Sequence, residues 1–86
     1  MTIAELIDRY RTAPGERARR EDTRHAQWWI QHMGREPIAA LTAERVCHAL
    51  DRLASYSRSP STVAFYLRFL RRVCAWGALM TLLPRD

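Results

Sequence analysis

The chain has no lysine among its 86 residues, so its fourteen strongly basic side chains are all arginine. It also has no Asp or Glu between Arg52 and Arg85, which leaves the positive charge of that stretch uncompensated. Arginine pairs bidentately with phosphate and with guanine edges, and the net charge of +5 favours a polyanionic partner. Codon bias in a GC-rich genome explains the same arginine usage, and the two explanations are compatible.

Long apolar runs are missing as well. No segment approaches the ~18 apolar residues of a membrane span, and the segment Met1 to Arg11 lacks the apolar run of a signal peptide. We therefore expect a soluble, cytoplasmic protein without a membrane partner. A chain of this length forms one domain of modest stability, with little room for a substrate cavity beside its core.

Cysteine is scarce, and the pattern of possible metal ligands is poor. Cys47 and Cys74 lie on or near apolar faces of predicted helices, so we expect buried free thiols, with a disulfide as the alternative. The chain contains no CxxC or HxxxH pair and no glycine-rich phosphate loop. We expect no metal, no cofactor and no active site, and therefore no enzymatic activity of this chain by itself.

Helical periodicity dominates the sequence, whereas no segment alternates cleanly enough for a strand. The prediction is an all-α bundle of four main helices. They span Ile3 to about Arg11, Glu21 to Met33, Ala43 to Ala54, and Pro60 to about Trp76, with a further short helical turn between Ala78 and Leu83.

Capping residues support these boundaries. Thr2, Thr42 and Ser59 are predicted N-caps, and Pro60 suits the first position of a helix. Gly34 fits a helix end that needs a left-handed backbone, and Gly77 is expected to end or kink the last helix. The residues expected to face the core are Ile3, Leu6, Ile7, Tyr10, Ala26, Trp29, Ile30, Met33, Ile38, Leu41, Val46, Leu50, Leu53, Val63, Phe65, Tyr66, Leu67, Phe69, Leu70, Val73, Cys74 and Trp76.

The last helix carries the stronger candidate for a nucleic-acid contact. Its start offers free backbone N–H groups and nearby hydroxyls, an arrangement that binds phosphate readily. Arginines follow on the same polar face, without the interleaved Glu of an ordinary solvated helix. The candidate contact residues here are Arg58, Ser59, Ser61, Thr62, Arg68, Arg71 and Arg72. A solvated amphipathic face is the plainer interpretation.

The helix from Glu21 to Met33 carries a second polar stripe opposite its apolar face. Its arginine and glutamine side chains are typical readers of phosphates and base edges. Glu21 and Asp22 dilute the positive charge nearby, so this stripe is the weaker candidate. It consists of Arg20, Arg24, Gln27 and Gln31.

The order of these elements resembles the N-terminal core-binding (SAM-like) domain of tyrosine recombinases and phage-type integrases. The opening helix Thr2–Tyr10, the passage from Trp29-Ile30 and Met33-Gly34 to Pro37–Thr42, and the helix from Ser59-Pro60-Ser61-Thr62-Val63 to Ala75-Trp76 are similar to that domain's degenerate motifs. Leu83-Pro84 stands where the family often has Asn-Pro. On this basis residues 1–83 form the DNA-binding domain, and residues 84–86 begin a linker to a catalytic domain.

The resemblance implies a function. In that family the domain and a separate catalytic domain clamp duplex DNA, and its second and fourth helices face the DNA. The expected partners are duplex DNA, the chain's own catalytic domain and further protomers on the DNA. The alternatives are a helix-turn-helix regulator and a protein-interaction bundle; exposure of Trp28, Phe69 and Trp76 together would favour the bundle.

Overall fold

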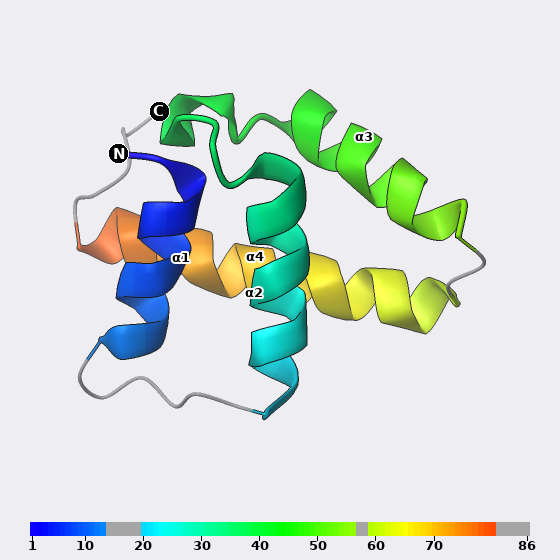
Figure 1. Ribbon diagram of the computed structural model, residues 1–86, viewed down its shortest axis with the longest axis horizontal. Helices are drawn as coiled ribbons and strands as arrows, with labels where there is room; N and C mark the ends of the chain where they lie inside the picture. The colour runs from blue at the N-terminus through cyan, green and yellow to red at the C-terminus, as the bar shows by residue number, and fades with distance from the viewer. Residues whose placement is uncertain (14–19, 57–58, 81–86) are drawn as a thin grey trace.

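The computed structural model describes residues 1–13, 20–56 and 59–80 of the chain, and these residues form an all-α bundle, as predicted (Figure 1). The helices α1 and α2 lie side by side and pack across α4, while α3 lies along another part of α4. No helix in the described ranges is long and apolar enough to cross a membrane. The elements are α1 (Ile3–Thr12), α2 (Arg20–Met33), the 3-10 helix η1 (Ile38–Ala40), α3 (Ala43–Ala54) and α4 (Pro60–Leu79).

The start of α1 is fixed by the predicted cap. The Thr2 hydroxyl accepts the backbone N–H of Glu5 at 3.2 Å, and the Glu5 carboxylate accepts the backbone N–H of Thr2 at 3.0 Å. This reciprocal capping box satisfies two otherwise unpaired donors. The backbone hydrogen bond from Thr2 holds the pKa of Glu5 below its ordinary value. From this start, α1 buries Ile3, Leu6, Ile7 and Tyr10.

Hydrogen bonds connect α1 and α2 at both ends of the pair. At the start of α1, the backbone N–H groups of Ile3 and Ala4 donate to the carbonyls of Glu36 and Gly34, at 2.9 and 3.0 Å. At the other end, the Arg11 guanidinium donates to the Thr23 hydroxyl at 2.9 Å. The two helices therefore form a hairpin that is closed at both ends.

Gly34 follows the last residue of α2, as predicted, but the reason differs from the expected one. Its φ lies outside the left-handed region. A Cβ at this position would stand 2.3 Å from the Ile30 carbonyl oxygen, far inside van der Waals contact. Glycine is required here because the backbone comes too close, while the Gly34 N–H completes the helix by donating to the same oxygen at 2.8 Å.

Helix α3 has the predicted bounds and is capped by Thr42, whose hydroxyl accepts the Arg45 N–H at 3.2 Å. It buries Ala49 and Leu53 and is held to the segment before it by an ion pair between Arg45 and Glu36. The expectation of a buried Cys47 was wrong. This thiol is exposed because Cys47 stands on nearly the opposite side of α3 from the buried Ala49.

Helix α4 begins at Pro60 with Ser59 as its N-cap, as predicted, but it does not end near Trp76. Gly77 does not end it: the helix continues to Leu79, and Gly77 is buried. A glycine inside a helix costs about 1 kcal/mol, which packing of the buried Gly77 against the rest of the domain can offset. Ala78 and Leu79 therefore belong to α4, and the rest of the predicted further turn, 81–83, lies outside the described residues.

The core lies where α1 and α2 cross α4. Trp29 is fully buried there, and its indole N–H donates to the backbone carbonyl of Tyr66 at 3.0 Å. Tyr10 packs edge-on against Phe69 and Trp76, with ring centroids 6.1 and 5.9 Å apart. The buried apolar residues are Ile3, Leu6, Ile7, Tyr10, Ala26, Trp29, Met33, Ala49, Leu53, Tyr66, Phe69, Leu70 and Val73.

Several residues expected in the core lie at its edge. Phe65 was misplaced: it is 51% exposed and lies at the edge of the buried face of α4, one turn before the fully buried Phe69. Cys74 is half-buried, and this burial raises the pKa of its thiol. Both cysteines are free, so the disulfide alternative is excluded. The other predicted core residues that are only half-buried are Ile30, Ile38, Leu41, Val46, Leu50, Val63, Leu67 and Trp76.

Candidate nucleic-acid interface

The exposed face of α4 carries most of the residues predicted to bind DNA. Arg68 and Arg71 are exposed on the side of the helix opposite Tyr66 and Val73, which are buried. The α4 face is defined here as Ser61, Ala64, Phe65, Arg68, Arg71 and Arg72. It projects away from the crossing with α1 and α2 because α4 uses its other side to make the core.

The three arginines of the α4 face are not equivalent. The guanidinium of Arg68 lies over the Phe65 ring, 5.5 Å from its centroid. That of Arg72 lies 5.7 Å from the centroid of Phe69, and Arg72 is half-buried. Arg68 and Arg71 are therefore the most accessible of these three arginines. No carboxylate occurs anywhere in α4, so the positive potential of this face is uncompensated within the helix.

Two of the predicted phosphate anchors have structural roles at the helix start. The Ser59 hydroxyl accepts the Thr62 N–H at 3.2 Å and shares a hydrogen bond of 3.0 Å with the Thr62 hydroxyl. Both oxygens are thus engaged in capping α4. Ser61, in contrast, is exposed on the α4 face. Arg58, which was predicted beside them, lies outside the described residues.

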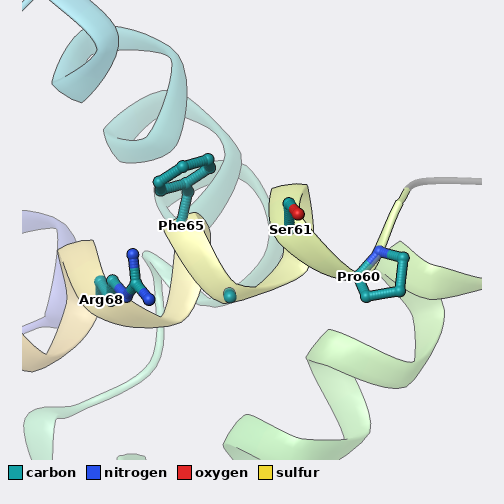
Figure 2. Close-up of a pocket in the computed structure, with 5 residues that line it drawn as sticks. Pro60, Ser61, Phe65 and Arg68 are labelled. Atoms are coloured by element: carbon teal, nitrogen blue, oxygen red, sulfur yellow. The ribbon is translucent and has the colours of Figure 1, made fainter.

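An open hollow of about 320 Å³ lies on the first two turns of α4. Figure 2 shows Ser61, Phe65 and Arg68 rising from α4 around this hollow, with α2 behind the helix in that view. The lining is mostly apolar, with a hydroxyl toward the helix start and a guanidinium at the other end. The residues that line it are Pro60, Ser61, Ala64, Phe65 and Arg68.

The second predicted contact set lies elsewhere on the domain. Arg24, Gln27 and Gln31 are exposed along α2, as a solvated stripe requires. They occupy the side of α2 opposite Trp29, the residue through which α2 packs on α4. The helices α2 and α4 cross (Figure 1), and each stripe lies on the side of its own helix that is turned away from the contact between Trp29 and Tyr66. The side chain of Arg20 lies outside what the structure describes.

Phe65 is the residue of this face that sequence reasoning missed. Hydrophobicity placed it with the core, although its helical position lies between Arg68 and Arg72 on one side and Phe69 on the other. That angular position is the signal that could have found it. The aromatic patch considered for a protein-interaction bundle is not formed, because Phe69 is fully buried and Trp28 and Trp76 are half-buried.

Other kinds of site find little support. Among the described residues, no three His, Cys, Asp or Glu side chains gather as metal ligands would. No protein-family model matches the chain, and neither the curated proteins nor the solved structures include a significant match. The geometry and charge of the α4 face are therefore the main indications of what the domain does.

Proposed function

We propose that this domain binds duplex DNA through the α4 face, as the core-binding domain of a site-specific tyrosine recombinase or integrase. One observation carries the proposal: Arg68 and Arg71 are exposed together on a face of α4, a helix that has no carboxylate. In this proposal a separate catalytic domain supplies the chemistry, and the present chain supplies position and affinity.

The α4 face suits a phosphate backbone better than a protein substrate. Arg68 and Arg71 stand three residues apart, so they lie close together on one side of the helix and can contact neighbouring phosphates of one strand. The exposed Ser61 adds a hydroxyl at the N-terminal end of α4, where the helix dipole favours an anion. Such contacts position a protein on the duplex without reading its sequence.

The stripe on α2 has a different place in this proposal. Arg24, Gln27 and Gln31 lie on the side of α2 turned away from its contact with α4, so we expect a duplex lying against the α4 face to leave them outside the same contact. The resemblance to the recombinase domain had suggested that both helices face the DNA. We assign the DNA contact to α4 and leave the α2 stripe available to the catalytic domain or to a neighbouring protomer.

Fluorescence anisotropy of a labelled duplex, titrated at several salt concentrations, tests the proposal. Arg68→Ala and Arg71→Ala should each weaken binding and reduce the slope of log K against log salt by about 0.9, the share of one phosphate contact. Arg24→Ala is the matched control, because it removes an exposed arginine that is not part of the α4 face. Its slope should equal that of the wild type.

The proposal fails if the wild-type chain binds no duplex at ~50 mM salt, where electrostatic binding is strong. The assignment to α4 fails separately if Arg24→Ala lowers affinity and slope as much as Arg68→Ala and Arg71→Ala do. Circular dichroism of each variant shows whether a loss of binding comes from loss of the fold.

A further inference from the structure

The hollow at the start of α4 contains an aromatic ring that the core does not use. Phe65 is 51% exposed, although the neighbouring aromatic residues Tyr66 and Phe69 are 3% and 0% exposed. Among the described residues, Phe65 makes no ring–ring contact, and its one aromatic interaction is with the guanidinium of Arg68. Burying an aromatic ring stabilises a small domain substantially. The Phe65 ring, which remains largely in contact with water, therefore contributes little to folding.

The surroundings of Phe65 combine a flat apolar area with positive charge. Ala64 and Pro60 also line the hollow, so two of the residues beside Phe65 have small side chains. Arg68 already lies at one side of the ring, and Arg71 follows one turn further along the helix. A ligand for this hollow therefore needs a planar face that can stack on Phe65 and Arg68. It also needs an anionic group beside that face to pair with the arginines.

A nucleotide whose base has left the duplex stack has both of these properties. Bases stack on aromatic side chains and on arginine planes without sequence preference, while adjacent arginines hold the phosphates. We propose that the hollow formed by Pro60, Ser61, Ala64, Phe65 and Arg68 binds one unstacked base, so that the domain prefers DNA with an unpaired nucleotide over fully paired DNA. This inference rests on the proposed DNA binding by α4 and adds the class of DNA that is favoured.

The test compares two labelled duplexes of the same sequence, one fully paired and one with a single extra adenine. Wild-type protein should bind the second at least about fivefold more tightly, because stacking of one base on an aromatic side chain is worth that factor or more. Phe65→Ala should remove this preference, because its affinity for the duplex with the extra adenine should fall to that for the paired duplex. Phe65→Tyr should retain the preference, and Phe65→Leu, which keeps apolar volume without an aromatic face, should lose most of it.

A second readout reports the stacked base directly. Placing 2-aminopurine at the unpaired position gives a fluorescence that falls when the base stacks on an aromatic ring. The fluorescence should decrease on addition of wild-type protein or Phe65→Tyr and stay unchanged with Phe65→Ala. Phe65 is exposed, so these substitutions should leave the fold intact.

The outcomes separate this inference from the proposed function. If wild-type protein binds both duplexes equally while Arg71→Ala weakens both, α4 binds DNA but the hollow does not bind a base. If Phe65→Ala keeps the preference, another part of the domain recognises the unpaired nucleotide, and the inference is overturned. If wild-type protein binds neither duplex, both ideas fail, and the α4 face is left as a surface for an acidic protein segment.

Discussion

Replacing Gly34 by alanine should destabilise the domain, against the usual effect of that substitution. In a helix-compatible site, Gly→Ala stabilises a protein by about 0.4–1 kcal/mol because it reduces the entropy of the unfolded chain. At Gly34 the new Cβ would meet three backbone atoms of Ile30, the carbonyl oxygen at 2.3 Å, Cα at 2.9 Å and the carbonyl carbon at 3.0 Å. Backbone atoms cannot rotate away as a flexible side chain can.

The clash can be relieved only by moving the end of α2. That segment also accepts backbone hydrogen bonds from Ala4 at 3.0 Å and from Ile3 at 2.9 Å, so a shift strains the junction with α1. Overpacking of this kind costs about 1–3 kcal/mol. A domain of this size loses roughly 4–8 °C in Tm per kcal/mol, which predicts a Tm lower by on the order of 5–20 °C.

Thermal unfolding followed by circular dichroism measures this loss, and Gly34→Asn separates the two explanations of the glycine. Asparagine tolerates a left-handed backbone, so Gly34→Asn would be nearly neutral if the left-handed explanation were right. Close approach predicts that Asn and Ala both destabilise. Arg35→Ala, at the exposed neighbouring residue, is the control and should change stability by less than about 0.5 kcal/mol. A Gly34→Ala protein with unchanged or higher Tm would refute the reasoning.

Two further predictions test the core and the thiols. Trp29→Phe should lower the free energy of unfolding measured in urea by about 2–3 kcal/mol, because it removes a buried hydrogen bond to Tyr66 and leaves a cavity. The same substitution at the half-buried Trp28 should cost less. Equal costs would contradict the role given to Trp29. At mildly alkaline pH, Cys47 should react rapidly with a thiol reagent, and Cys74 slowly, because Cys47 is exposed while burial raises the pKa of Cys74. Peptide mapping identifies the thiol modified first, and initial modification of Cys74 would disprove the assignment.

Local signals in the sequence predicted the helix starts well. Thr2, Thr42 and Ser59 each act as the expected N-cap, and Pro60 begins α4. These predictions succeeded because capping depends on hydrogen bonds within four residues of the chain. Gly77 failed as a stop signal because it is itself buried within α4, and tertiary packing can outweigh the low helix propensity of glycine.

The candidate site was harder to predict because it depends on how the helices cross. A helical wheel shows that Arg24 and Arg68 are both solvent-facing, but it contains no information about their relative direction. That direction is fixed by Trp29 packing on Tyr66 between the two stripes. Phe65 was misassigned for a similar reason: residue type suggested burial, whereas the direction of the neighbouring helices decides which edge of α4 is covered.

The closed α1–α2 hairpin has a consequence for how the domain opens. Hydrogen bonds at both ends join the two helices, and together they cover the inner side of α4. Helix α3, in contrast, packs chiefly on α4 and buries only Ala49 and Leu53. Local opening follows the elements with the fewest buried contacts, so amide hydrogens of α3 should exchange before those of α1 and α2. The α1–α2 hairpin, which packs on the inner side of α4 and supports the α4 face, would then stay folded after α3 has detached.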